Sequence, residues 1–276
     1  KKDARLVLLG NGLGSRMMSF GYFETEVHRR HVGKRLFIRN MCDEGNTPGF
    51  RPHSGRPSPW AFPGAESFYA ARSKAKDRWG SSHVGVGDYD SPDEWLTRLK
   101  PDVVVAFFGF NESFRGVDGL DRFKEELHAF VTHTKSRRYN GVEAPQLALI
   151  SPIAFEDLSD SHGTPNGTVA NANIALYTAA MEEVAKESDT LFVNLFAVSQ
   201  TWYTESAEAL TRDGALLSDQ GYQRLAPVLA QALFGEVSES DGKARVDSIL
   251  ASVREKNWLW HKHYKIPNGV HVYGRR

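Results

Sequence analysis

Cysteine is almost absent from this sequence. The single residue of this kind, Cys42, excludes an internal disulfide and any metal site built from several cysteines, while it leaves the redox compartment open. The chain has no Cys-x-x-Cys-His segment for covalent haem attachment, and no pair among its 10 histidines has a recognised metal-ligand spacing with a carboxylate partner. We therefore predict no resident metal and no cofactor in this chain.

Net charge and long apolar runs are missing as well. Lys and Arg together number 34, as do Asp and Glu, so no summed field favours a nucleic acid or a membrane surface as the partner. No apolar run approaches the roughly 18 residues of a membrane span, and the first residues lead into a strand without a signal-peptide core. We expect a small or neutral molecule as the partner, in either a cytoplasmic protein or a mature piece of an exported one.

Short apolar runs alternate with stretches of helical periodicity along the chain. Mostly apolar runs of strand length occupy residues 5–10, 35–39, 103–108, 146–150 and 190–195. Apolar residues recur at helical spacing in residues 15–30, 119–136 and 169–186. Repeated β-α units of this kind predict an α/β fold in three layers, in which helices cover both faces of a parallel sheet. We expect a flavodoxin-like order with the first strand central and the second beside it, because the ligand crevice needs a switch point there.

One α/β domain with insertions accounts for the 276 residues. We assign residues 1–243 to this domain and residues 244–276 to a C-terminal helix with an aromatic and basic tail, which packs on the domain or links it to a further module. Residues 44–92 are rich in Gly, Pro, Ser and aromatics without sustained periodicity, which predicts an insertion that covers or builds a site. Its His53, Arg51 and Trp60 either line a sugar-binding cleft or belong to an insertion packed by its own aromatics.

A glycine-rich turn follows the first predicted strand. Residues 10–15 (GNGLGS) are similar to a dinucleotide-binding turn, in which glycines let backbone amides reach a pyrophosphate. The third glycine position of that pattern holds Ser15, however, and the second strand ends in Arg39 and Asn40, where an NAD site needs an acidic residue. The pattern therefore favours a tight turn that packs a helix against the sheet.

Four short blocks, in order along the chain, resemble the conserved blocks of the SGNH (GDSL-type) hydrolases. Residues 10–13 (GNGL) resemble the Gly-Asp-Ser-Leu block. Residues 40–45 are similar to the block with the oxyanion-hole glycine, which this likeness places at Gly45. Residues 109–112 (GFNE) resemble the Gly-x-Asn-Asp block, and residues 213–217 (DGALL) resemble the Asp-x-x-His block. The resemblance implies an SGNH hydrolase fold with all four blocks at the carboxyl ends of strands, where open α/β sheets bind ligands.

The resemblance also implies what each position does. It places Gly12 at the nucleophilic serine, Leu216 at the histidine and Asp213 at the aspartate of the family triad. Glycine has no side chain that attacks an acyl carbon, and leucine accepts no proton, so the triad has lost two of its three members. The ligand-binding residues that the resemblance implies are Asn11, Gly12, Gly45, Asn111, Glu112 and Asp213. Without a histidine to orient, Asp213 is expected to accept hydrogen bonds from its own turn.

A closer likeness is to SGNH-like domains of large planctomycete and bacteroidete proteins that also carry c-type haem-binding and sugar-dehydrogenase-like modules. The stretches that carry it are residues 46–52, 60–66, 107–114, 151–158 and 258–276. This resemblance implies that the chain is one module of an exported multidomain protein, periplasmic or extracellular, and covalently linked to haem-binding or dehydrogenase-like modules.

Three functions follow from the sequence. The leading one is a degenerate SGNH domain that binds a small, carbohydrate-like ligand. The second is an active esterase or glycosidase on sugars that uses other residues, and the third is an architectural module that positions redox domains. For the second, loop carboxylates that converge on one cleft would supply an acid and a base, as in glycosidases, although solvated loop positions are the commoner outcome. These carboxylates are Asp43, Glu44, Glu112, Glu156 and Asp157.

Overall fold

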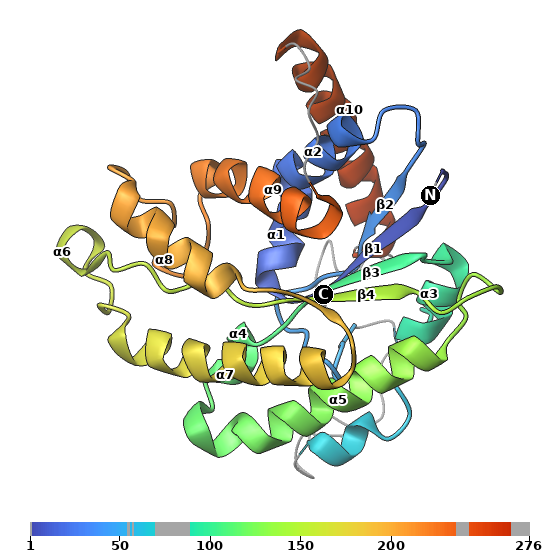
Figure 1. Cartoon of the computed structure of the whole chain (residues 1–276), viewed down its shortest axis with the longest axis horizontal. Coiled ribbons are helices and arrows are strands. Elements are labelled where there is room, and N and C mark those ends of the chain that lie inside the picture. The colour runs from blue at the N-terminus through green and yellow to red at the C-terminus, as the bar shows by residue number, and fades with distance from the viewer. Residues whose placement is uncertain (1, 54–55, 57, 70–88, 236–242, 266–276) are drawn as a thin grey trace, which may run out of the picture.

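The computed structural model describes residues 2–53, 56, 58–69, 89–235 and 243–265. Its strands form one parallel sheet in the order β2-β1-β3-β4-β5 (Figure 1). They are β1 (Arg5–Gly10), β2 (Phe37–Asn40), β3 (Val103–Phe107), β4 (Gln146–Ile150) and β5 (Leu191–Val193). The predicted α/β class and the flavodoxin-like order are confirmed, with β1 paired to β2 on one side and to β3 on the other.

Helices cover both faces of this sheet (Figure 1). One face carries α1 (Gly12–Phe20), α2 (Tyr22–Arg30), α8 (Leu195–Glu205) and α9 (Asp219–Phe234). The other face carries α3 (Pro92–Leu99), α5 (Leu120–Ser136) and α7 (Thr168–Glu187). Leu6 and Leu8 of β1 pack with the first set, whereas Val7 and Leu9 pack with the second. Successive side chains of a strand point to opposite faces, so the central strand contributes to both cores.

Short helical elements lie in the connections between these larger ones. They are η1 (Ala65–Phe68), α4 (Phe110–Ser113), η2 (Gly116–Gly119) and α6 (Ser159–His162). Of these, α4 follows β3 directly, so its residues lie at the carboxyl end of the sheet. Within the described residues, the helices fall short of the length and apolar character that a membrane crossing requires.

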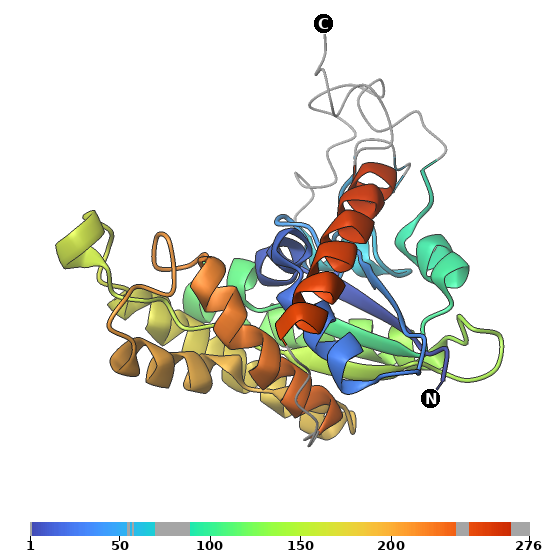
Figure 2. The same cartoon turned by 90° about the horizontal axis from the view of Figure 1, so that it is seen from above.

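The C-terminal helix α10 (Lys243–Tyr264) packs on α1 and α2, and Figure 2 shows it along that side of the molecule. Trp260 Nε1 donates to the carbonyl oxygen of Asn40 at the end of β2 (2.7 Å). Asn257 Nδ2 donates to the carbonyl oxygen of Met18 in α1 (3.1 Å). Side chains of α10 therefore bind the backbone of the sheet and of its first helix. The predicted aromatic and basic tail beyond this helix lies outside the described residues.

The described part of the predicted insertion packs on itself. Phe50 and Trp60 pair in an antiparallel bridge, and their rings lie 5.6 Å apart. The ring of Tyr69 lies 5.5 Å from Phe50 and 5.3 Å from Trp60. Arg51 is only 3% exposed, with its guanidinium over the ring of Phe130. These contacts favour an insertion packed by its own aromatics over a sugar-binding cleft at Arg51 and Trp60, and the rest of the insertion lies outside the described residues.

The glycine-rich turn after β1 serves close packing, as the tight-turn interpretation predicts. Gly10 has a φ of +120°, and a Cβ there would lie 2.0 Å from the carbonyl oxygen of Phe107, so only glycine fits. A Cβ on Gly14 would lie 2.5 Å from Cys42 Sγ, which lets α1 approach the end of β2. These two glycines place the amino end of α1 directly over the carboxyl edge of the sheet.

Candidate functional site

A small cavity of about 110 Å³ lies at the carboxyl end of the sheet. Its walls come from the segments that follow β1, β2, β3 and β4 and from the loop that precedes α9. The lining residues are Asn11, Gly12, Leu13, Glu44, Phe107, Phe108, Phe110, Asn111, Ser151, Pro152, Ile153, Ala215 and Leu216. The structure therefore brings Asn11, Gly12 and Asn111 together with Leu216, although they are up to about two hundred residues apart in the sequence.

Gly12 lines the cavity, and no close packing contact requires a glycine at this position. It lies in the first turn of α1, and its φ is not positive. A Cβ built at Gly12 has one neighbour within 4 Å, Glu44 Cγ at 3.8 Å. Unlike the glycines at either side of it in the turn, Gly12 leaves open space that points toward Glu44.

Asp213 and Leu216 occupy one turn before α9. Asp213 Oδ1 accepts hydrogen bonds from the backbone N–H groups of Ala215 (3.0 Å) and Leu216 (2.8 Å), as the sequence predicts. Asp213 is exposed and, among the described residues, is not part of the cavity wall, whereas the Leu216 side chain is part of it. The carboxylate thus holds the turn that presents an apolar side chain to the cavity.

Asn111 uses both of its amide hydrogens on the loop after β2. Its Nδ2 donates to the carbonyl oxygens of Glu44 (2.7 Å) and Asn46 (3.0 Å). An oxyanion hole needs donors that point at the developing charge, and these two point at the protein instead. Asn111 therefore fixes the loop and leaves its Oδ1, an acceptor, as the polar atom available to a ligand. Gly45, the expected second donor, is exposed, has no atom within 4 Å of a Cβ position, and is not in the described cavity wall.

Glu112 lies behind the cavity wall rather than in it. It is only 4% exposed, and its Oε2 accepts from the backbone N–H of Gly109 (2.7 Å) in the capping box of α4. Its Oε1 has no hydrogen-bond partner within the described part of the chain. Burial raises the pKa of Glu112 to about 8, so the carboxyl group is mostly protonated at neutral pH. The structure thus gives Glu112 a place in the interior and not among the groups that face a ligand.

The loop carboxylates do not converge on one cleft, which corrects the paired-carboxylate expectation. Glu156 is buried and accepts from the backbone N–H groups of Leu210 (3.1 Å) and Thr211 (2.7 Å). Asp157 accepts from the N–H and the hydroxyl of Ser159. Glu156 thus ties its loop to the segment before α9, and Asp157 is engaged within its own loop. Of the five, Glu44 alone belongs to the described wall of the cavity.

Glu44 is the ionised group of the cavity. Its Oε1 accepts a hydrogen bond from Ser15 Oγ (3.0 Å), and that hydroxyl in turn accepts from Lys265 Nζ (2.6 Å). Lys265 Nζ also lies 3.5 Å from Asp43 Oδ1. Burial by itself raises the pKa of Glu44, but hydrogen bonding to Asp43 and to Ser15 and the charge of Lys265 outweigh it and lower the pKa to about 2. Burial and the hydrogen bond to Glu44 raise the pKa of Asp43, so the two neighbouring carboxyl groups shift in opposite directions.

Sequence reasoning missed the link from Lys265 to this cavity. The two hydrogen-bonded partners Ser15 and Lys265 are 250 residues apart, one in α1 and the other just after α10. No local pattern indicates such a contact. In the structure Ser15 is buried, and its hydroxyl is hydrogen-bonded to both Glu44 and Lys265.

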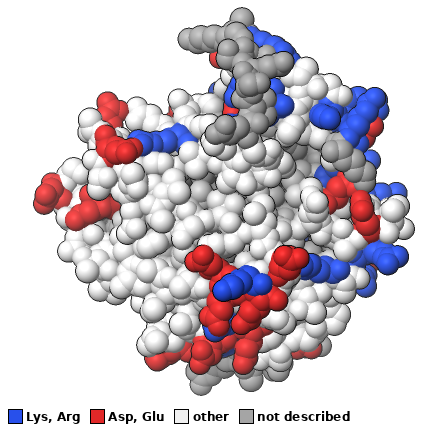
Figure 3. Space-filling model, in the orientation of Figure 1, with Lys and Arg blue, Asp and Glu red and all other residues white. Residues whose placement is uncertain are grey.

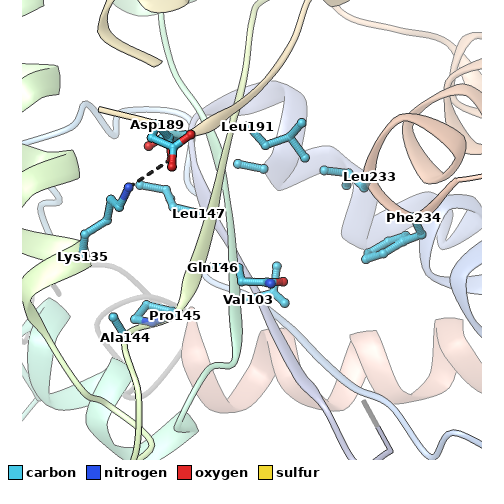
Figure 4. Close-up of a pocket in the computed structure, with 12 residues that line it drawn as sticks. Val103, Lys135, Ala144, Pro145, Gln146, Leu147, Asp189, Leu191, Leu233 and Phe234 are labelled. Atoms are coloured by element: carbon cyan, nitrogen blue, oxygen red, sulfur yellow. Dashed lines mark hydrogen bonds between the residues drawn. The ribbon is translucent and has the colours of Figure 1, made fainter. Parts of the chain in front are cut away.

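A larger hollow of about 470 Å³ lies at the opposite, amino end of the strands (Figure 4). Val103, Gln146 and Leu191 line it from three strands, and Phe234 lines it from the end of α9. Its lysine, Lys135, already donates to the carbonyl oxygens of Ser188 and Asp189. None of the four predicted blocks reaches this hollow, so the cavity at the carboxyl edge remains the candidate site.

The family of the chain follows from its sequence match. The model of the GDSL-like lipase/acylhydrolase family matches residues 53–224, which is more than half of the chain. The chain belongs to the GDSL-like lipase/acylhydrolase family. The matched part of this GDSL-like domain includes Asn111, Asp213 and Leu216, and it begins after Gly12 and Glu44. A comparison with curated protein sequences gives no match.

Solved structures share the fold of this GDSL-like domain. A catalytic mutant of Axe2, an acetylxylan esterase from Geobacillus stearothermophilus, has 17% sequence identity and a TM-score of 0.57, and the match covers 87% of this chain and 98% of that one. LAE5, an alpha/beta hydrolase enzyme from the metagenome of Lake Arreo, has 16% identity and a TM-score of 0.55, with 86% and 98% covered. At these identities the likeness shows the fold alone.

Proposed function

We propose that this GDSL-like domain binds a small, carbohydrate-like ligand in the cavity at Gly12 and no longer performs acyl transfer. The observation that carries the proposal is Glu44, which lines the cavity, has its Cγ 3.8 Å from the place of a Cβ at position 12, and bears an ionised carboxylate. An active hydrolase of this family needs a nucleophile in this cavity, together with positively charged groups or hydrogen-bond donors that stabilise the oxyanion. This cavity offers a negative charge there.

The missing triad members support the loss of catalysis. Structures of Axe2 include catalytic mutants in which alanine replaces a serine, an aspartate or a histidine, the last two being three positions apart. Here Asp213 is followed three positions later by Leu216, and the helix after β1 begins with Gly12. A hydrolase stripped of its triad retains only about a thousandfold to ten-thousandfold acceleration over water.

The charge of Glu44 opposes even that residual chemistry. Acyl transfer places negative charge on an oxygen, and two like charges 4 Å apart repel by about 4 kcal/mol at an effective dielectric constant of about 20. Solvent screening at this partly exposed carboxylate lowers the figure, but every 1.4 kcal/mol or so is still tenfold in rate. Since Asn111 directs its amide hydrogens to the loop, no side-chain donor of that residue offsets the repulsion.

The same groups favour a ligand that donates hydrogen bonds. Glu44 and the Oδ1 of Asn111 are acceptors, and the remaining wall is largely apolar, with Phe107, Phe108 and Phe110 among its members. Sugars combine hydroxyl donors with carbon-rich faces, which suits acceptors set among aromatic rings. A volume of about 110 Å³ admits part of a sugar ring or one of its substituents. The acetylxylan esterase among the solved structures supports a sugar as the ligand class.

Calorimetric titration with free and acetylated sugars tests the proposal. Wild-type protein should bind members of this panel, and Glu44→Gln should weaken binding, because a charged acceptor contributes about 1.5–3 kcal/mol to a hydrogen bond. The control Glu182→Gln removes an exposed carboxylate on α7 and should leave the affinity unchanged. Efficient turnover of 4-nitrophenyl acetate by the wild-type protein, abolished by replacing a serine, would show an active hydrolase and overturn the proposal.

The resemblance to modules of larger proteins supports a second part of the proposal. We infer that the domain acts within an exported multidomain protein and holds its ligand near haem-binding or dehydrogenase-like modules. The support is the likeness of residues 46–52 and 258–276 to SGNH-like domains of such proteins. Fractionation of the native cells tests this inference, with the full-length polypeptide expected in the periplasmic or extracellular fraction and stained for haem. A polypeptide confined to the cytoplasm contradicts it.

A further inference from the structure

An exposed aromatic ring stands at the rim of the cavity. Phe110 lines the cavity, and its ring meets that of Phe114 edge to face, with centroids 5.3 Å apart and planes at 83°. Phe114 is 76% exposed, the highest value, shared with Val169, among the large apolar side chains that are described as exposed. A single exposed apolar side chain is common on protein surfaces. The ring of Phe114 is notable because it contacts a side chain that lines a cavity.

The surroundings of Phe114 come from η2 and from the start of α7. Val117 is 68% exposed, and Val169 lies one helical turn before Asn173 on α7. A Cβ on Gly116 would lie 3.8 Å from Asn173 Oδ1, so η2 and this face of α7 touch. In the described structure the Asn173 amide makes no hydrogen bond. Figure 3 shows the beginning of α7 without charged side chains. The exposed groups close to Phe114 in the chain include the apolar Val117 and the charged Arg115 and Asp118.

We propose that Phe114 forms a second sugar-binding subsite, so that the ligand is an oligosaccharide and not a single sugar; this inference rests on the function proposed above. The first sugar enters the cavity at Glu44 by one edge, and the next ring of the chain lies on the exposed face of Phe114. The amide of Asn173 is the hydrogen-bonding group for the hydroxyls of that second ring. The geometry of the two phenylalanines links the subsites, because Phe110 belongs to the cavity and holds Phe114 beside it.

An oligosaccharide fits these groups better than an alkyl chain does. A pyranose ring presents a carbon-rich face to an aromatic ring and hydroxyl donors and acceptors at its edge, which matches one open ring beside one amide. An alkyl chain needs a continuous apolar groove, and it leaves Asn173 and Glu44 without partners. The cavity of about 110 Å³ is also too small for a whole disaccharide, so a longer ligand must extend over the rim.

Titration with xylose and xylotetraose separates the two subsites. Phe114→Ala should weaken xylotetraose binding about fivefold to tenfold, the scale of one aromatic contact, and change xylose binding less than twofold. Phe114→Tyr should restore the tetraose affinity because it keeps the ring. Trp258→Ala, which removes an exposed aromatic side chain of α10, is the matched control and should change neither affinity.

The outcomes distinguish this inference from the function on which it rests. If wild-type protein binds neither saccharide, the proposed function fails and the subsite fails with it. If xylose binds and Glu44→Gln weakens it, but Phe114→Ala leaves xylotetraose unchanged, the second subsite alone is overturned. Equal loss of both affinities in Phe114→Ala likewise overturns it, since that result means damage to the first subsite. Binding of octyl glucoside that exceeds glucose and depends on Phe114 assigns the surface to an alkyl chain and overturns the oligosaccharide.

Discussion

Three glycines within five residues play different parts at the end of β1. Gly10 and Gly14 are required by close approach, because a Cβ at either would lie 2.5 Å or less from a neighbouring atom. Gly12 between them has room for a side chain, and its φ suits any residue. Sterics therefore explain the first and third glycine but not the second. We interpret the glycine at position 12, together with Leu216 and Glu44, as a change in the chemistry of the cavity, in line with the proposed function.

Rebuilding the family triad tests that interpretation. Gly12→Ser combined with Leu216→His should give at most weak turnover of 4-nitrophenyl acetate, because Glu44 stays beside the new hydroxyl and an ångström of misplacement is enough to lower the rate a hundredfold. Adding Glu44→Gln should raise the initial rate at least tenfold, since it removes the like charge from the oxyanion. The single variant Glu44→Gln is the control and should remain inactive. A triple variant no faster than the double one contradicts the electrostatic argument.

Glu112 gives the stability of the domain a dependence on pH. Its ordinary pKa is near 4.5 and burial raises it to about 8, so above pH 4.5 the unfolded chain releases a proton that the folded protein retains. The free energy of unfolding should therefore fall as the pH rises from about 4.5 to 8 and level off beyond, by an amount on the order of a few kcal/mol.

Urea unfolding at several pH values measures this dependence. Glu112→Gln keeps an acceptor for Gly109 N–H and has no proton to release, so its free energy of unfolding should lose most of that downward slope. Glu182→Gln, at an exposed position of α7, serves as the control and should keep the wild-type slope. A Glu112→Gln protein with an unchanged slope means that another group sets the pH dependence.

At the scale of elements, hydrophobic patterning locates strands and helices but not their breaks. The predicted helices at 119–136 and 169–186 agree with α5 and α7 within a residue or so. The predicted helix at 15–30 is in fact two, because Gly21 adopts a φ of +76° and ends α1 before α2 begins. The apolar spacing continues across Gly21, so the pattern alone gives no sign of the break. At the start of α9, Ser218 caps the helix, since its Oγ accepts from the N–H of Gly221.

Substitutions of Asp213, in the turn before α9, test the role of its hydrogen bonds. Asp213→Asn keeps the oxygen that accepts from Ala215 and Leu216, so the free energy of unfolding and the ligand affinity should each change by less than about 1 kcal/mol. Asp213→Ala removes both hydrogen bonds and should destabilise the domain by about 1 kcal/mol or more. Urea unfolding and calorimetry measure the two effects. If Asp213→Asn left binding intact but abolished a turnover present in the wild type, Asp213 would be a general base instead.

At the scale of the whole molecule, the first helix of the chain and the end of its last described helix meet beside the candidate site, through Ser15 and Lys265. The four blocks near the sheet edge were predictable from sequence because parallel strands end on one side. The use of Asn111 on the loop, and the contact of Lys265 with Ser15, were not, because they depend on side-chain geometry between segments far apart in sequence. Through Trp260, α10 also satisfies a backbone carbonyl at the end of β2. The C-terminal helix thus packs on the elements that build the cavity.

Substitutions of Trp258 and Trp260, two residues apart on α10, test whether the packing of this helix stabilises the protein. Trp260 is 8% exposed, packs among aromatic side chains and donates to the carbonyl oxygen of Asn40, whereas Trp258 is 60% exposed. Trp260→Ala should lower the free energy of unfolding by about 3–5 kcal/mol, because it leaves a cavity and an unpaired carbonyl. Trp258→Ala should stay within about 0.5 kcal/mol of the wild type.

Since Lys265 follows Trp260 by little more than one helical turn, Trp260→Ala should also weaken sugar binding at Glu44, while Trp258→Ala should not. Equal and small effects of both variants on unfolding would mean that α10 packs on the domain without stabilising it.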